Sequence, residues 1–313
     1  MVENTVVPEE RKFFSIPIKI VKKNIFQNIY FPLIVMMRKH GIKLPFCYDI
    51  LILFKKMKIA SFNTNGIRAR LSIIKDWLET ERPDVLCIQE TKVQDKDFPR
   101  DTFEDISYHC TFWGQKTFNG VAILSKIQLT KISLGFGDGD EKEEPRMITA
   151  YIEDIPIVNT YVPQGTEPDS ERFKYKLDWL RRLRDYFLQH FRPSEPLLWV
   201  GDFNVAPEPA DVYDPEALIG SIGFHPEEHK ALSAIKSWGF VDVFRLHHPH
   251  VKAYTFWDYR IPHAFRHGLG WRVDHIWATP CLAEKSKRSW IDVAPRKLRR
   301  PSDHTFILAE FEI

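Results

Sequence analysis

The sequence predicts an α/β domain in which two β-sheets pack face to face between outer helices. Segments with strand-like and helix-like patterns alternate along residues 57–313. Most of the strand segments are short, and the helices are fewer than the strands, which argues against a strict repeat of strand, helix and parallel strand. Two central sheets covered by helices on both outer faces, a four-layer sandwich, fit this pattern better.

The individual elements follow from hydrophobic periodicity. Short or alternating apolar runs predict strands at 58–62, 85–88, 120–124, 148–152, 155–161, 197–200, 271–278 and 306–311. Apolar residues at helical spacing predict a helix through Leu71, Ile74, Trp77 and Leu78 that stops before Pro83. The same spacing predicts a long helix through Phe173, Leu177, Leu180, Leu183 and Phe187, and another through Leu232, Ile235 and Trp238.

The first 56 residues differ from the rest in charge. They hold 10 basic and 4 acidic residues, whereas 57–313 holds 34 basic and 38 acidic residues. Their longest charge-free stretch, 24–37, has 14 residues, fewer than the roughly 20 that a spanning helix needs. No small-residue cleavage site of a signal peptide follows it. We expect a poorly ordered tail, a loosely attached basic extension, or an upstream-start artefact with Met57 as the native start, and no membrane anchor.

Composition excludes several classes of protein. Hydrophobic residues make up 44% and charged residues 27% of the chain, which excludes a disordered chain, a collagen and a coiled coil. A formal net charge of +2 is too balanced to predict a nucleic-acid partner by itself. Cys47, Cys87, Cys110 and Cys281 form no C-x-x-C pair, so we expect no disulfide framework and a reducing, cytoplasmic compartment.

Polar residues stand at the ends of several predicted strands. Five strand segments run into Asn63, Glu90, Tyr161, Asp202 with Asn204, or Asp274, and Ser302-Asp303-His304 precedes the last strand. A single Asp after a strand is usually a turn former or a helix cap. Six such groups together are typical of a divalent-metal phosphate site, because magnesium prefers hard oxygen ligands.

Eight sequence motifs carry a more specific resemblance. In order, they are SFNTNGIRAR (61–70), PDVLCIQETK (83–92), GQKTFNGVAILSK (114–126), NTYVPQG (159–165), WVGDFNVAP (199–207), YTFWDYR (254–260), GWRVDHIWAT (270–279) and PSDHTF (301–306). The sequence resembles the exonuclease III family of DNA-repair nucleases, within the endonuclease/exonuclease/phosphatase superfamily. The resemblance covers nearly all of 57–313 and implies a deoxyribonuclease I-like catalytic domain there.

The resemblance also implies roles for single residues. It implies a Mg²⁺ site, which Mn²⁺ can also fill, with Glu90 as the principal carboxylate and Asp303 at a second position. The candidate ligands are Glu90, Asn63, Asp202, Asn204, Asp303 and His304. Asn65 would lie at the amide end of the same site, since an extended N-x-N points both side chains the same way. The candidate catalytic residues are Asp202, which would orient or deprotonate the attacking water, Asn204, Tyr161, and the Asp274–His304 pair.

The substrate-binding candidates lie in the C-terminal motifs and around them. Phe256, Trp257, Trp271 and Val273 resemble the family's abasic-sugar pocket, with plain core residues as the alternative. Gln164 and Arg68 are weaker candidates for the DNA backbone, and Arg260, Arg266, His267 and Arg272 for nearby phosphates. In the segment 208–229, Gly220 and Gly223 predict an uncluttered loop.

These roles imply a monomeric enzyme that hydrolyses phosphodiesters of duplex DNA 5′ to abasic sites and at 3′ ends, leaving a 3′-hydroxyl. No covalent intermediate is expected. Two alternatives stay open. One is a phosphatase of the same superfamily acting on a small or lipid phosphate ester, and the other is a catalytically silent DNA-binding homologue.

Overall fold

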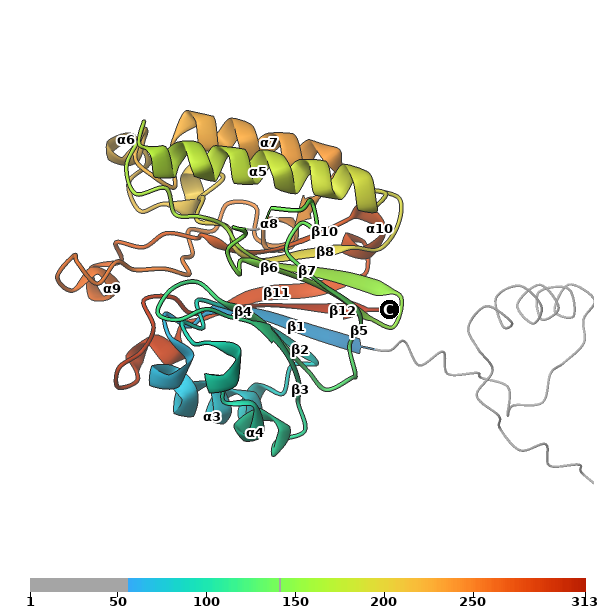
Figure 1. The fold of residues 1–313 in the computed structure, drawn as a ribbon. Coiled ribbons are helices and arrows are strands. Elements are labelled where there is room, and N and C mark those ends of the chain that lie inside the picture. Colours follow the sequence, from blue (N-terminus) through green and yellow to red (C-terminus); the bar gives the residue numbers. More distant parts are fainter. Residues whose placement is uncertain (1–55, 141) are drawn as a thin grey trace, which may run out of the picture. The chain divides into compact units, whose positions relative to one another are not determined.

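The computed structural model describes residues 56–140 and 142–313, which form two six-stranded mixed sheets with helices on their outer faces (Figure 1). The first sheet has the order β11-β12-β1-β2-β4-β3. Its strands are β1 (Lys56–Asn63), β2 (Val85–Gln89), β3 (His109–Trp113), β4 (Val121–Ser125), β11 (Ser286–Asp292) and β12 (Phe306–Glu312). The predicted α/β four-layer architecture is confirmed.

The second sheet has the order β5-β6-β7-β8-β10-β9. Its strands are β5 (Thr130–Leu134), β6 (Met147–Ile152), β7 (Ile155–Tyr161), β8 (Leu198–Asp202), β9 (Val241–Asp242) and β10 (Asp274–Ala278). In each sheet one central pair is parallel, β1 with β2 and β7 with β8, and the other pairs are antiparallel.

The central strands are apolar on both faces, because both faces are covered. In β2, Val85 and Cys87 point into the core between the sheets, whereas Leu86 and Ile88 point to the helical layer. This alternation follows from the two-residue period of a strand. Near-continuous apolar runs are therefore needed where a sheet is buried on both sides.

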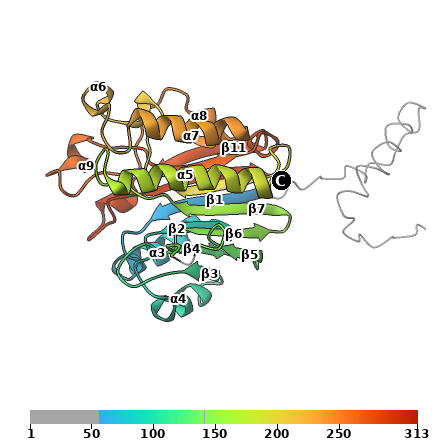
Figure 2. The same ribbon diagram turned by 45° about the horizontal axis from the view of Figure 1, so that its top comes forward.

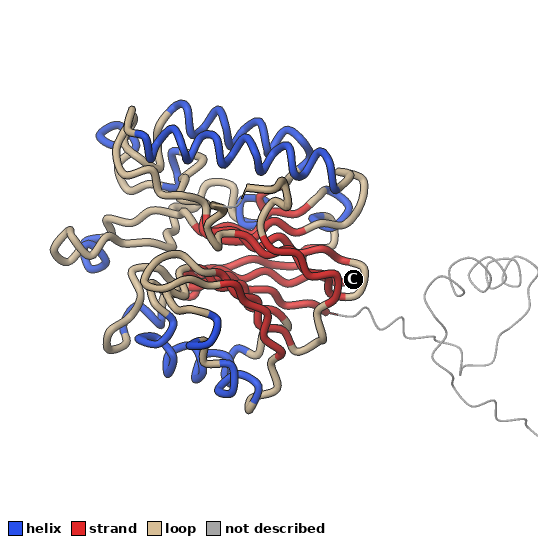
Figure 3. Tube along the Cα trace, in the orientation of Figure 1, coloured by secondary structure: helices blue, strands red, loops and turns tan. Residues whose placement is uncertain are grey.

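The helices form the two outer layers, blue in Figure 3. On the first sheet lie α3 (Leu71–Glu81) and α4 (Arg100–Glu104), and on the second lie α5 (Glu171–His190) and α7 (Pro226–Gly239), which run side by side (Figure 2). The shorter helices are α6 (Pro215–Leu218), α8 (Val243–His247), α9 (Ala264–His267) and α10 (Pro280–Ala283). Ser170 caps α5 by accepting the N–H of Phe173 at 3.1 Å, which fixes where the helix begins after the loop that follows β7.

One sequence prediction lies outside the described residues, and another is shortened by the structure. The basic segment 1–56 lies outside the described residues except for Lys56, where β1 begins. The strand predicted at 271–278 starts only at Asp274, and Trp271 makes isolated bridges to Val212 and Phe256 instead. Within the part of the chain that the structure describes, no helix has both the length and the apolar character needed to cross a membrane.

Candidate active site

Strand register brings the predicted polar residues to one edge of the two sheets. Tyr161 at the end of β7 pairs with Asp202 at the end of β8, and Asp202 pairs with Asp274. Asp274 is the first residue of β10, not a residue at a strand end as the sequence pattern indicated. It still reaches the same edge because β10 runs antiparallel to β8. In the other sheet Asn63 pairs with Gln89, which places Glu90 beside it.

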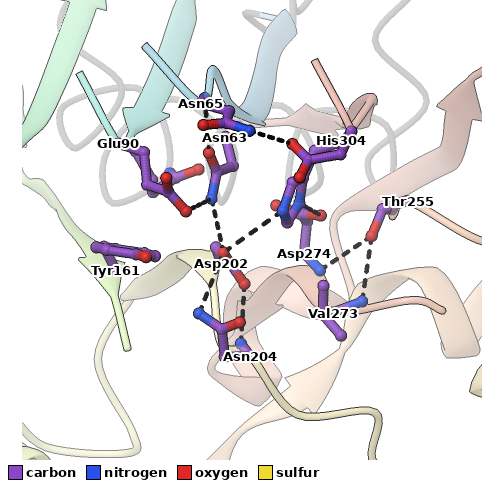
Figure 4. A network of polar contacts seen from close by, with 12 residues as sticks. Asn63, Asn65, Glu90, Tyr161, Asp202, Asn204, Thr255, Val273, Asp274 and His304 are labelled. Atoms are coloured by element: carbon purple, nitrogen blue, oxygen red, sulfur yellow. Dashed lines mark hydrogen bonds and ion pairs between the residues drawn. The ribbon is translucent and has the colours of Figure 1, made fainter. Parts of the chain in front are cut away.

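Asn63 joins the carboxylates of the two sheets. Its Nδ2 donates to Glu90 Oε1 at 2.8 Å and to Asp202 Oδ2 at 2.8 Å (Figure 4). The side-chain Oδ1 of Asn63 accepts the backbone N–H of Asn65 at 2.9 Å. In this arrangement Asn63 orients two acids that come from different sheets. The expectation of an extended N-x-N was wrong, because Asn65 has φ 45° and the chain turns there.

Asp202 is fully buried and is held by the loop that follows it. Its Oδ1 accepts the N–H of Asn204 at 2.9 Å, and the Asn204 side chain donates to Val162 O at 2.8 Å. Asn204 also has a left-handed backbone, with φ 49°. Burial raises the pKa of Asp202 to about 7, although the nearby His304 opposes this shift. A carboxyl group with this pKa is suited to accept a proton near neutral pH.

Asp274 and His304 form a buried acid–imidazole pair. His304 Nδ1 lies 2.8 Å from Asp274 Oδ2, and its Nε2 lies 3.9 Å from Asp202 Oδ2. Burial would lower the pKa of His304, but the carboxylates of Asp274 and Asp202 raise it to about 10. Thr255 Oγ1 supports the pair by accepting the N–H groups of Val273 and Asp274, both at 3.1 Å.

The charge on His304 bears on its predicted role as a metal ligand. One ligand atom each from Asp202, Asp274 and His304 lies within 4.8 Å of the others. A doubly protonated imidazole has no lone pair to offer a metal. This charge favours His304 as a donor to an anion, and leaves the carboxylates as the groups that could bind a metal.

Glu90 fits the principal place in a hard-cation site. Burial would raise the pKa of its carboxyl, but Lys92 and Asn63 hold it below the usual range, so Glu90 carries a negative charge. Lys92 Nζ lies 2.6 Å from Glu90 Oε2 and also donates to Asn65 Oδ1 at 2.5 Å. The amide of Asn65 in turn donates to Asp303 Oδ1 at 3.0 Å. Oxygen donors of this kind suit Mg²⁺ or Mn²⁺.

Tyr161 presents a neutral phenol to this edge. Burial raises the pKa of its hydroxyl well above the usual range, and the charge of Glu90 raises it further. The Arg146 guanidinium lies 4.8 Å from the centre of the Tyr161 ring and donates to Tyr161 O at 3.3 Å. The ring is thereby fixed while its hydroxyl remains a hydrogen-bond donor.

A cavity of about 510 Å³ opens over these groups. Phe256 borders it beside His304, with 4.8 Å between the ring centres, and pairs through its backbone with Trp271. Eleven residues predicted from the sequence line it, namely Asn65, Glu90, Tyr161, Gln164, Asn204, Phe256, Arg260, Trp271, Val273, Asp303 and His304. Polar and aromatic candidates from separate motifs thus share one cavity.

Five predicted contacts are placed elsewhere, including Arg266 and His267, which lie in α9 and do not line the cavity. Arg68 is exposed, with its guanidinium 3.6 Å from Asp97, and Trp257 is buried edge-on against Phe265. Neither lines the cavity. Arg272 was expected near phosphate, but it is fully buried and its guanidinium binds Asp211 and Asp242. Its positive charge is paired with two carboxylates inside the protein and is not available to a phosphate.

Two features of the site were missed or misread. Lys92 was not singled out, although it ends the QETK motif two residues after Glu90. Gly223 was interpreted as part of an open loop, but it has φ +85° and packs closely. A Cβ added there would lie 3.3 Å from both Asn204 O and the Trp271 ring. Gly220 has nothing within 4 Å of such a Cβ, so the open-loop interpretation holds there only.

The chain is similar to known nucleases over most of its length. The chain is 34% identical over 268 residues to exodeoxyribonuclease III of Haemophilus influenzae, covering 82% of this chain and 100% of that protein. It superposes with a TM-score of 0.79 on an AP endonuclease from Archaeoglobus fulgidus, at 45% identity, with 82% of this chain and 100% of the other covered.

A second solved structure has the same TM-score. It is the 3′ phosphatase NExo from Neisseria bound to product DNA hairpin, at 34% identity and with 82% and 100% covered. Residues 60–304 match the Endonuclease/Exonuclease/phosphatase family as a whole. The resemblance read from the motifs is confirmed, and the chain belongs to the Endonuclease/Exonuclease/phosphatase family.

Proposed function

We propose that this protein is a Mg²⁺-dependent DNA-repair nuclease. It hydrolyses the phosphodiester 5′ to abasic sites in duplex DNA and removes 3′ nucleotides or 3′-blocking groups, leaving a 3′-hydroxyl. One observation carries the proposal, which is that Glu90, Asp202 and the Asp274–His304 pair converge beside a cavity bordered by Phe256 and Trp271. The relatives described as exodeoxyribonuclease III and AP endonuclease support it.

The side chains divide the work of hydrolysis. Asp202 accepts a proton from the attacking water, because the pKa of its carboxyl, about 7, lets it act as a base near neutral pH. His304, kept charged by Asp274, donates toward the phosphoryl oxygens as negative charge grows on them. The neutral phenol of Tyr161 donates toward the leaving oxygen, and the amide of Asn204 positions the phosphate.

The residues that would hold the metal are Glu90 and Asp202, with Asp303 at a second position. A bound Mg²⁺ neutralises charge on the phosphoryl oxygens and stabilises the leaving alkoxide. No nucleophilic side chain is needed, because water is the attacking group. The products are a 3′-hydroxyl and a 5′-phosphate.

Substrate choice is assigned to the aromatic side of the cavity. An abasic nucleotide leaves the helical stack at low cost, since it has no base to unstack or unpair. Phe256, Trp271 and Val273 would receive its sugar and exclude an intact nucleotide. Beyond the site, we propose a monomer that acts in the cytoplasm, with 57–313 as the catalytic domain.

The test compares three substrates in Mg²⁺, with and without a chelator. They are a labelled duplex with one internal abasic-site analogue, an undamaged duplex with a recessed 3′ end, and a panel of inositol phosphates. We expect a chelator-sensitive nick immediately 5′ to the lesion and slower shortening of the recessed end. Folded protein that cuts neither duplex but releases phosphate from the inositol phosphates would overturn the proposal in favour of a small-molecule phosphatase.

A further inference from the structure

A fully buried ion pair lies behind the active site, in the outer helical layer. Lys176 on α5 and Glu228 on α7 are both 0% exposed, and Lys176 Nζ lies 2.5 Å from Glu228 Oε1. The surrounding interface between these helices and the second sheet is apolar, with Leu180 and Leu232 among its members. A hydrophobic pair of similar volume would stabilise such an interface about as well. The charges are therefore not explained by helix packing alone.

The ammonium group of Lys176 reaches two loops of the active site. Besides its ion pair with Glu228, it donates to Asn204 O at 2.7 Å and to Gln164 O at 3.0 Å. Two of the three N–H donors of the ammonium therefore hold backbone carbonyls, with Glu228 as the counter-ion. Asn204 lies two residues beyond the end of β8 and has a left-handed backbone, so Lys176 holds its carbonyl outside the strand ladder. Lys176 thus fixes the backbone whose side chain contacts Asp202.

The second oxygen of Glu228 holds a third loop. Its Oε2 accepts the N–H of Gly223 at 2.7 Å and of His225 at 3.1 Å. Gly223 O in turn accepts the N–H of Ala206 at 2.7 Å. Gly223 also packs against the Trp271 ring, which borders the cavity. The same ion pair therefore connects the catalytic loop after β8 with the aromatic side of the substrate cavity.

We propose that Lys176 and Glu228 are positioning residues, which hold the Asn204 loop, the Gln164 loop and the Gly223 loop in the register that catalysis requires. This inference rests on the nuclease function proposed above, because that function defines the substrate on which the three loops would act. Neither side chain is exposed, so neither touches DNA. Their loss should misplace the Asn204 amide and slow the chemical step, while the surface that binds DNA stays largely intact. A displacement of about 1 Å in a catalytic group can lower a rate by roughly 10²-fold.

The first test replaces the buried lysine and an exposed one on the same helix. Lys176→Met keeps the apolar stem and removes the charge, and Lys174→Met is the matched control, since Lys174 is exposed and forms a surface ion pair with Glu171. Under single-turnover conditions on the abasic duplex, we expect Lys176→Met to lose about 10- to 100-fold in cleavage rate per folded molecule. Its Kd for DNA should change by less than about threefold, because it makes no DNA contact. Lys174→Met should match the wild type in both.

A second variant tests whether the activity of Lys176→Met is lost only because that protein fails to fold. Lys176→Met/Glu228→Gln removes both charges but keeps an acceptor for the N–H groups of Gly223 and His225, so a stable fold is expected. Its cleavage rate should remain lowered, because Asn204 O and Gln164 O still lack their donor. A wild-type rate per folded molecule in both variants, with only a lower thermal midpoint, would show an ordinary structural ion pair and overturn the inference.

Hydrogen exchange separates this inference from the proposed function. The N–H groups of Asn204 and Ala206 are bonded to Asp202 Oδ1 and Gly223 O, and we expect their exchange to accelerate at least about tenfold in Lys176→Met. If the wild type does not cut DNA, the nuclease proposal fails while exchange still tests the positioning role. Unchanged exchange at both amides would contradict the positioning role whether or not DNA is cut.

Discussion

The side chain of Gln89 donates a hydrogen bond of 2.7 Å to Asn159, and this contact crosses the core between the two sheets. Asn159 completes the link by donating to Ile88 O at 3.1 Å and Ala122 O at 2.9 Å. Gln89 directly precedes Glu90, and Asn159 lies two residues before Tyr161 on β7. The alignment of the two sheets at the active-site edge is thereby fixed by buried amides within an otherwise apolar core.

Replacing Asn159 with Leu should destabilise the fold. The substitution removes three buried hydrogen bonds of the Asn159 side chain, although the Gln89 amide keeps a bond to Ser61 Oγ at 3.1 Å. Each lost bond is expected to cost about 0.5–1.5 kcal/mol. We expect the free energy of unfolding, measured with urea, to fall by about 2 kcal/mol or more. Gln189→Leu on the exposed side of α5 is the control and should change it by less than about 0.5 kcal/mol. An unfolding curve for Asn159→Leu that overlays the wild type would contradict the role of this link.

Replacing Asp274 with Asn should uncouple the acid–imidazole pair. The carboxylate of Asp274 is the main group that raises the pKa of His304 to about 10, so the variant should show a His304 ring that titrates several units lower. Cleavage at neutral pH should fall by about 10²-fold or more, because the charged donor is lost. The ring can be followed by NMR across pH. A His304 that stays charged above pH 9 in the variant would be incompatible with this account.

Two tryptophans from neighbouring motifs should respond differently. Trp271 lines the cavity, so Trp271→Ala should lower cleavage of the abasic duplex more than shortening of an undamaged 3′ end. Trp257 is buried outside the cavity, so Trp257→Ala should cost about 3–5 kcal/mol of stability and leave the ratio of the two activities unchanged. The comparison needs both rates per folded molecule. The same shift in activity ratio for both variants would refute the assignment.

The stability of the fold should depend on pH through His275. Its fully buried ring accepts from Arg272 at 2.9 Å through Nδ1 and bonds Val205 O at 3.0 Å through Nε2, so the neutral ring satisfies both contacts. Burial, with help from Arg272, lowers the pKa of His275 to about 4. Between pH 6.5 and 4 the unfolded chain therefore binds a proton that the folded chain does not.

The contribution of His275 to the free energy of unfolding is complete above pH 6.5, declines as the pH falls, and is lost below about pH 4, for a total of about 3 kcal/mol. Denaturant unfolding at a series of pH values measures it. His275→Gln should remove this part of the pH dependence, whereas His250→Gln, at an exposed position, should retain it. Parallel profiles for all three proteins would rule out His275 as the source.

The sequence predicted the buried strands better than the edge strands, for a physical reason. β2, β4 and β8 are buried on both faces and read as apolar runs, whereas β3, β5, β9 and β11 were missed. All four are edge strands. β9 has two residues, and the other three have largely exposed or half-exposed side chains, with β5 exposed throughout. An edge strand has fewer apolar positions, so periodicity offers little to detect.

For the site, too, some residues were predicted from the sequence and others were not. Residues within single motifs, such as Glu90 and Asp202, were predicted from the resemblance and come together because the strands pair. Lys176 and Glu228 were not predicted, because an ion pair between helices leaves no local pattern. Arg272 was misassigned for the related reason that a surface arginine and a buried one look alike in sequence, and only Asp211 and Asp242 reveal the difference.

The most direct test of the central claim is single-turnover cleavage of a duplex with one internal abasic-site analogue, by wild type and by Asp202→Asn in Mg²⁺. Asn keeps the shape of the side chain but cannot accept the proton of the attacking water. We predict that both proteins bind the duplex with similar Kd and that the variant nicks it 5′ to the lesion about 10²–10⁴-fold more slowly than the wild type. Equal cleavage by the two proteins would contradict the assignment of Asp202 as the base, and binding without cleavage by either would contradict the nuclease itself.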